Sequence, residues 1–266
     1  MSLVFTSICP HPPIIVPTVG QPADLKIVSK TIEGMEQLAK KFAKAKPETV
    51  IVISPHGPID FRNFTISDSP TLAGHFHMFG DFDTEFVFKN NQSLIEKIKK
   101  EADKAKIPLK LADIEKMDHG TLVPLYYLVK SHPSVKIVPL TVSFLDLETH
   151  FELGKILGRA ISDKQQETRI GIVASGDLSH RLTSGAPGGY SPRGKEFDEK
   201  IVELLKKKDV KGILNMDKDL IEKAGECGYR SILILLGALD GLNWKPEILS
   251  YEAPFGVGYL VANFNL

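Results

Sequence analysis

The sequence is poor in cysteine, carries no excess of charge of either sign and contains no long apolar run. Two cysteines in 266 residues do not make a disulfide framework and indicate a reducing compartment. Lys and Arg number 33, as do Asp and Glu, so no basic surface for nucleic acid or an anionic membrane is predicted. The strongest apolar stretch, within SILILLGALDG, is too short to span a bilayer. We therefore expect a cytoplasmic protein that binds neither nucleic acid nor membrane.

Common catalytic and targeting signatures are also missing. The sequence has no G-x-S-x-G elbow, no P-loop, no H-E-x-x-H and no G-x-G-x-x-G behind a predicted strand. The first residues, MSLVFTSICPHPP, lack a basic segment and reach proline too early for a signal peptide. Any chemistry must therefore come from residues that are separated along the chain and brought together by the fold.

The hydrophobic pattern alternates between strands and helices. Apolar runs typical of buried strands lie at 3–9, 49–54, 136–143 and 169–175, and helical spacing covers 25–45, 92–106, 122–130, 148–162, the region around 197–205, and 220–240. The last residues predict a strand pair that turns near 254–256. Such alternation predicts an α/β fold with a largely parallel or mixed central sheet and helices on both faces. No linker divides the chain, so we expect a single domain over residues 1–266.

Reactive side chains follow several of the predicted strands. Open α/β sheets bind ligands outside the carboxyl ends of their strands. The first strand ends in CPHPP, the second in SPHG and the strand at 169–175 in SGDLSH, while DHGTLVPLYYL places a histidine just before a buried helix. The residues expected at this edge are Cys9, His11, His56, His119, Asp177 and His180. One histidine beside a proline is usually a turn or surface residue, but four that meet at one edge indicate a shared site.

Several imidazoles in one place indicate a transition metal, and two histidines with one carboxylate leave iron(II) open positions for substrate and dioxygen. The candidate carboxylates are Asp177, Glu226 and Glu252, the last being the more structural by its place on a strand end. Gly225 and Gly228 flank Glu226 at a helix entrance, where the backbone can approach closely. The alternative interpretation of Glu226 is an acid favoured by the helix dipole. The pair His75 and His77, in GHFHMFGDF, is expected in a surface hairpin.

Taken together, these segments resemble the superfamily of class III extradiol ring-cleavage dioxygenases. The resemblance rests on ICPHPPIIVP, ISPHGP, DHGTLVPLYYL, ASGDLSHRL, AGECGYRSILILLGAL and SYEAPFGVGYLVA, which occur in the right order over nearly the whole chain. The sequence looks closest to the branch associated with the AmmeMemoRadiSam system, and the more distant Memo family shares the fold. The resemblance implies a class III extradiol dioxygenase-like domain, and at family level a homodimer.

The resemblance also implies roles for individual residues. His11, His56 and Glu226 match the iron(II) ligands, and Cys227 matches a cysteine that replaces the glutamate in Memo-like proteins. His180 matches the acid–base residue and His119 a histidine that positions substrate. Asp177 would orient His180 or a water molecule. The implied metal is iron(II), with zinc or copper as the alternatives.

Two functions follow as hypotheses. The first is an iron(II) dioxygenase that cleaves the ring of a small, catechol-like aromatic substrate with dioxygen, using His180 to accept and return a proton. The second is a Memo-like metal-binding redox or interaction protein without ring cleavage, or a zinc-dependent hydrolase. Fold alone does not decide between them.

Overall fold

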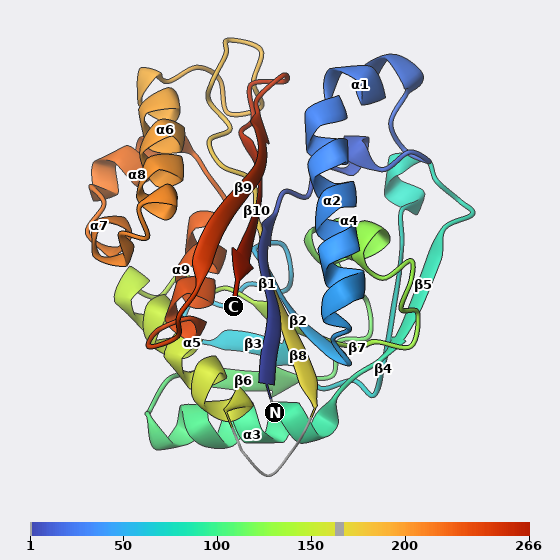
Figure 1. The fold of residues 1–266 in the computed structure, drawn as a ribbon, viewed down its shortest axis with the longest axis vertical. Helices are drawn as coiled ribbons and strands as arrows, with labels where there is room; N and C mark the ends of the chain where they lie inside the picture. Colours follow the sequence, from blue (N-terminus) through green and yellow to red (C-terminus); the bar gives the residue numbers. More distant parts are fainter. Residues whose placement is uncertain (1, 163–167) are drawn as a thin grey trace.

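A computed structural model describes residues 2–162 and 168–266, and within them the chain forms the expected α/β fold. Its helices lie on both sides of a large sheet (Figure 1). The strands are β1 (Ser2–Cys9), β2 (Thr49–Ser54), β3 (Phe64–Ser67), β4 (Thr71–His75), β5 (Glu85–Lys89), β6 (Leu109–Ala112), β7 (Lys136–Thr141), β8 (Arg169–Ser175), β9 (Lys245–Glu252) and β10 (Tyr259–Asn265). The α-helices are α1 (Pro22–Ile27), α2 (Ser29–Ala45), α3 (Gln92–Lys104), α4 (His119–Leu128), α5 (Leu147–Ile161), α6 (Pro192–Lys206), α7 (Val210–Leu214), α8 (Lys218–Ala224) and α9 (Tyr229–Ala238). Two short 3-10 turns are η1 (Pro13–Ile15) and η2 (His77–Phe79).

The central sheet is mixed and has the strand order β6-β3-β7-β2-β8-β1-β10-β9. Its middle, from β7 through β2 and β8 to β1, is parallel, so these four strands end at the same edge. Antiparallel pairs join β3 to β7 on one side and β10 to β1 on the other. A separate antiparallel pair, β4–β5, lies outside this sheet.

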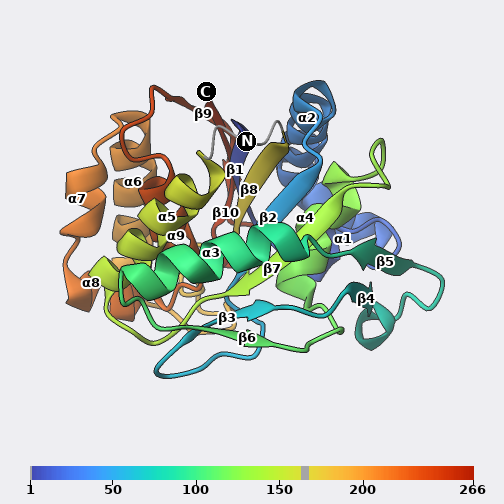
Figure 2. The same ribbon diagram turned by 90° about the horizontal axis from the view of Figure 1, so that it is seen from below.

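Each face of the sheet has its own hydrophobic core. Along β2, Ile51 and Ile53 belong to the core under α3, α5 and α9, whereas Val50 and Val52 belong to the core under α2 and α4. Side chains alternate between the two faces of a strand, so an unbroken apolar run is what burial on both faces requires. Figure 2 shows α3 crossing the sheet near β3 and β6, on the side away from α2.

Most predicted elements are confirmed, with a few differences. The helical segment 25–45 is divided between α1 and α2, because the helix is interrupted at Val28. The segment 220–240 is two helices, α8 and α9, because Gly225 adopts a left-handed conformation (φ 60°) that ends α8 and starts a turn over 225–228. The strands β3 and β6 were not predicted, since each has only four residues, whereas β4 and β5 form the hairpin expected around His75 and His77. The final strand pair, β9 and β10, is confirmed.

Candidate metal centre

The carboxyl ends of β1, β2 and β8, which are neighbours in the sheet, bring most of the predicted site residues together. His11 follows β1, His56 follows β2, and Asp177 and His180 follow β8. His119 joins them as the first residue of α4. These turns form one cluster because parallel strands all deliver their carboxyl ends to the same edge.

His11 lies at the centre of this cluster and is almost completely buried, at 2% exposed. Its Nδ1 lies 2.9 Å from the hydroxyl of Ser175, which donates its own hydrogen to the carbonyl of Gly120 at 2.5 Å. That carbonyl is free because its usual helical partner would be Pro124, which has no N–H. With its single proton committed, Ser175 can only accept from His11, so Nδ1 carries the proton and Nε2 presents a lone pair.

His56 and His119 are held next to each other by Asp118, the N-cap of α4. Its carboxylate accepts the Thr121 amide at 3.1 Å and the Ser54 hydroxyl at 2.6 Å, which ties the start of α4 to the end of β2. The rings of His56 and His119 consequently stack, with centroids 4.4 Å apart. The Nε2 atoms of His56 and His11 are 2.9 Å apart.

Cys227 reaches the cluster because the turn before α9 packs backbone to backbone against the end of β8. A Cβ on Gly176 would lie 2.1 Å from the Cα of Gly228, so only glycine fits at this crossing. The Asp177 carbonyl accepts the Gly228 amide at 2.9 Å, and the Asp177 amide donates to Cys227 Sγ at 3.2 Å. This packing fixes the thiol beside the turn that carries Asp177.

Three potential ligand atoms therefore lie within 4 Å of His11 Nε2. They are His56 Nε2 at 2.9 Å, Cys227 Sγ at 3.6 Å and Asp177 Oδ2 at 3.9 Å. The ligand atoms of His11, His56 and His119 all lie within 4.8 Å of one another, as do those of His11, Asp177 and Cys227. The two groups share His11.

Glu226 lies beside this cluster in sequence, but its carboxylate is used elsewhere. Its Oε2 accepts the Tyr229 amide at 2.5 Å at the start of α9, the helix-end role that was the alternative interpretation. It lines a cavity of about 450 Å³ that also contains Arg230 and Phe144. Among the described residues, Glu226 belongs to neither of the two ligand groups, whereas its neighbour Cys227 does.

Burial controls the charge of the cluster. Desolvation lowers the pKa of His11 well below its usual value, and the neighbouring His56, His119 and His180 lower it further. Burial likewise lowers the pKa values of His56, His119 and His180, so all four rings are neutral lone-pair donors near pH 7.

The acids of the cluster respond to burial in the opposite direction. Burial raises the pKa of Asp177 to about 7. The His11 amide, which donates to the Asp177 carboxylate at 3.0 Å, lowers this pKa but does not offset the effect of burial. Burial and then the Asp177 charge raise the pKa of the Cys227 thiol. A bound cation reverses this preference by favouring the ionised carboxylate and thiolate.

His180 approaches the cluster without joining either ligand group. Its ring is half-buried and influences the pKa of His11, which places it beside the candidate ligands. Its Nδ1 is buried and has no hydrogen bond of normal geometry to the described residues, although the Gly225 and Leu178 carbonyls act on the ring to raise its pKa. The lowered pKa leaves the ring neutral near pH 7, next to the candidate ligands.

A cavity of about 300 Å³ opens directly onto His56 and His119. Its other walls include the apolar side chains of Met78, Phe79 and Met117, and His75 from the end of β4. His75 stacks on His77 with ring centroids 3.7 Å apart, so the H-x-H pair lies in a hairpin as predicted, but His75 also faces this cavity. Sequence analysis missed that role because nothing in GHFHMFGDF indicates which wall the hairpin covers.

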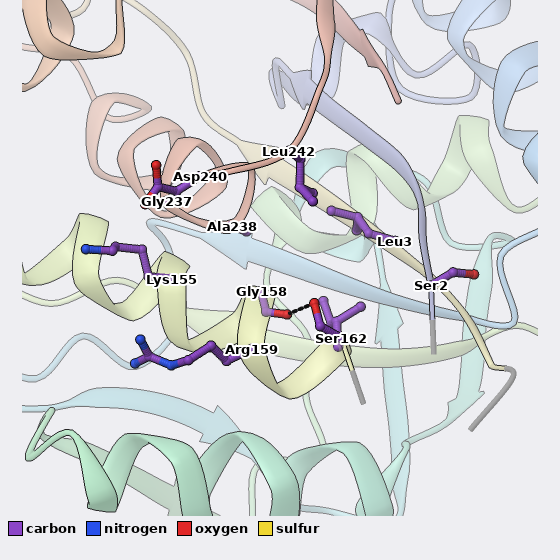
Figure 3. A pocket seen from close by; sticks show the side chains of 11 residues that line it. Ser2, Leu3, Lys155, Gly158, Arg159, Ser162, Gly237, Ala238, Asp240 and Leu242 are labelled. Carbon is purple, nitrogen blue, oxygen red and sulfur yellow. Dashed lines mark hydrogen bonds between the residues drawn. The ribbon is translucent and has the colours of Figure 1, made fainter. Parts of the chain in front are cut away.

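A larger cavity, of about 590 Å³, lies elsewhere. It is lined by Ser2 at the start of β1, by Lys155 and Arg159 on α5, and by Asp240 after α9 (Figure 3). It thus opens at the amino end of β1, opposite the end that carries His11. Neither ligand group contributes to it, so it is not part of the candidate metal centre.

No helix in the described part of the chain combines the length and apolar character needed to cross a membrane.

Comparison with known proteins adds several relatives. Protein CA_C1420 of Clostridium acetobutylicum is 38% identical over 97% of this chain and 57% of its own length. A gallate dioxygenase of Pseudomonas putida is 33% identical over 34% of this chain and 27% of its length, and the MEMO1 family protein MJ0403 of Methanocaldococcus jannaschii is 32% identical over 44% and 37%. The match thus covers 57% or less of the length of each of these relatives.

The fold also matches a solved structure. The crystal structure of uncharacterized protein JW3007 from Escherichia coli K12 superposes with a TM-score of 0.69 over 98% of this chain and 99% of that one, at 20% identity, which supports the fold alone. The family model described as the catalytic LigB subunit of aromatic ring-opening dioxygenase matches residues 6–262. Because that match covers nearly the whole chain, the protein belongs to the LigB family.

Proposed function

We propose that this protein is a metal-dependent oxidoreductase of the dioxygenase type, which holds iron(II) through His11, His56 and Asp177 and acts on a small catechol-like substrate. The observation that carries the proposal is the arrangement around His11 Nε2, where a second imidazole and a carboxylate lie at 2.9 and 3.9 Å. We assign Asp177 the place that the family resemblance gave to Glu226, because one Glu226 oxygen accepts the Tyr229 amide and Glu226 belongs to neither ligand group of the described residues.

The chemistry of these donors fits iron(II). Two neutral imidazoles and one carboxylate are the ligand set of non-haem iron(II) oxygenases, and they leave positions open for the reactants. The hydrogen bond from His11 Nδ1 to Ser175 fixes the tautomer that such a ligand needs. When bound, iron(II) would supply a centre to which catechol oxygens and dioxygen both bind.

The surrounding residues of the chain would bind the substrate and move its protons. The cavity beside His56 and His119 has the apolar walls that an aromatic ring requires, and the His119 ring borders it on the cluster side. His180 is neutral near pH 7, so it would accept a phenolic proton as the substrate binds and return one to the product.

Cys227 favours a second candidate function, that of a metal-handling or redox protein like the Memo relatives. Its Sγ lies 3.6 Å from His11 Nε2, slightly closer than the Asp177 carboxylate. A thiolate ligand selects soft ions such as copper(I) or zinc over an open iron(II) site. The two functions therefore differ in whether Asp177 or Cys227 completes the site.

Electron paramagnetic resonance of the anaerobic, iron(II)-loaded protein with nitric oxide tests the proposal. We expect a high-spin iron–nitrosyl signal that changes when catechol is added, because both ligands would occupy open positions at one ion. An Asp177→Asn variant should lose this signal, while the matched Cys227→Ser variant should keep it. If the signal is absent, or survives Asp177→Asn and disappears in Cys227→Ser, the iron(II) proposal is wrong and the thiolate site is favoured.

A further inference from the structure

Asp198 on α6 is a fully buried acid that lies outside the candidate metal centre. Its side chain is 0% exposed, and no cation of the described residues forms an ion pair with it. Its Oδ1 accepts the Ser179 amide at 2.9 Å, and its Oδ2 accepts the Tyr251 hydroxyl of β9 at 2.7 Å. Burial raises its pKa to about 7. Burying a carboxyl group without a neighbouring cation lowers the stability of the fold, so the presence of an acid at this position calls for a role that its two hydrogen bonds fulfil.

The first of these bonds holds Ser179, the residue before His180. The Ser179 hydroxyl donates to the Ala224 carbonyl at 2.8 Å and accepts the Arg181 amide at 3.1 Å, while the Ser179 carbonyl accepts the Gly258 amide at 2.9 Å. All the polar groups of Ser179 are therefore bound. Gly258 leaves the necessary space, since a Cβ there would lie 2.0 Å from Asp198 Oδ2.

The His180 ring is held only loosely by its own polar contacts, because its Nδ1 has no hydrogen bond of normal geometry to a described residue and only the Gly225 and Leu178 carbonyls act on the ring. The direction of such a ring depends strongly on the backbone that carries it. The Ser179 amide, which lies one residue before the ring, is held by the buried Asp198 carboxylate. We infer that Asp198 is a positioning residue, which aims the His180 ring at the metal centre by holding the Ser179 amide.

This inference rests on the proton-transfer role proposed for His180, and it makes a distinct structural prediction. Asp198→Ala removes the acceptor, so the Ser179 amide should lose at least about tenfold of its hydrogen-exchange protection. The His180 ring should then sample several orientations, which would broaden its Cε1–H resonance. Asp198→Asn keeps an acceptor for the amide and adds a donor for Tyr251, so it should restore both signals. A role that needs the negative charge would not be rescued by Asn.

The decisive experiment measures these two signals by NMR in the full chain, together with dioxygen uptake in the iron(II)-loaded protein with catechol. Asp198→Ala should lower the turnover rate at least about tenfold with little change in KM, as expected for a misaimed proton acceptor. In a His180→Ala background the same substitution should cause no further loss. Asp209→Ala is the control, since it removes a carboxylate that accepts the Gly212 amide at 2.8 Å outside the site.

Wild-type exchange protection and an unchanged His180 signal in Asp198→Ala would overturn the inference. So would a loss of turnover in the His180→Ala background, on adding Asp198→Ala, as large as the loss in the wild-type background. If Asp198→Ala does not fold, Asp198→Leu replaces it, because it fills the same space without an acceptor. The NMR signals also separate the two proposals. Absence of turnover in the wild type, with the expected NMR changes, would refute the dioxygenase function and leave the positioning role intact.

Discussion

Replacing Ser175 with alanine should damage the proposed metal centre without removing any of its proposed ligands. The Ser175 hydroxyl is the partner of two buried groups, the Nδ1–H of His11 at 2.9 Å and the Gly120 carbonyl that Pro124 leaves free at 2.5 Å. Each buried group that loses its partner costs about 1–3 kcal/mol, so the free energy of unfolding should fall by at least that amount. Loss of the bond that fixes a ligand's tautomer typically weakens metal binding by about 10–100-fold.

Ser231 offers a matched control for this substitution. It is as deeply buried as Ser175, at 0% exposed, but its hydroxyl has no hydrogen-bond partner among the described residues. Ser231→Ala should therefore leave both stability and metal affinity near the wild-type values. Urea unfolding of the metal-free variants and zinc titration against a chromophoric chelator measure the two quantities. If Ser175→Ala binds zinc within about twofold of the wild type, the bond to Ser175 does not support zinc binding by His11 and the reasoning about the His11 tautomer fails.

Three further changes should have separate effects. His180→Ala should keep the catechol-sensitive iron–nitrosyl signal but lower dioxygen uptake by about 10²–10⁴-fold, and an equal loss of both would show that His180 binds the metal instead. Cys227→Ser should weaken copper(I) binding much more than iron(II) binding, measured by chelator competition, and equal losses would make the thiol an iron ligand. Burial lowers the pKa of His150 from 6.5 to about 4, so below pH 6.5 the unfolded chain binds a proton that the folded one does not. The free energy of unfolding should therefore fall by up to about 1.4 kcal/mol for each pH unit between 6.5 and 4, and not above pH 6.5. Urea unfolding at pH 7 and 5 should show a smaller fall in His150→Gln, and an equal fall would place the pH dependence elsewhere.

The sheet was predictable where burial leaves a clear pattern. The strands β2 and β8 are buried on both faces and are apolar almost throughout, so their runs are unmistakable. The four-residue strands β3 and β6 carry no such signal. Their place in the sheet is set by long-range pairing, with β3 running antiparallel to β7, and no local pattern encodes that pairing.

The same distinction applies to the metal centre. Residues that directly follow parallel strands, such as His11, His56 and Asp177, were predictable because the fold fixes where strands end. Which of the neighbours Glu226 and Cys227 lies nearer to His11 was not predictable, since adjacent side chains point in different directions: the Cys227 thiol lies 3.6 Å from His11 Nε2, while Glu226 accepts the Tyr229 amide. The role of Ser175 depends on a proline in another element, so it too is visible only in three dimensions.

The contact between Gly176 and Gly228 gives two residues without side chains control over the composition of the site. A single methyl group at Gly176 would lie 2.1 Å from the opposite backbone, so the turn that carries Cys227 would have to move. Asp177 directly follows Gly176, and its backbone is hydrogen-bonded to Gly228 and Cys227, so the carboxylate would be disturbed together with the thiol. The two candidate third ligands, one soft and one hard, therefore depend on a single backbone contact, and no side chain at Gly176 can shift the proposed site from one to the other without disturbing both.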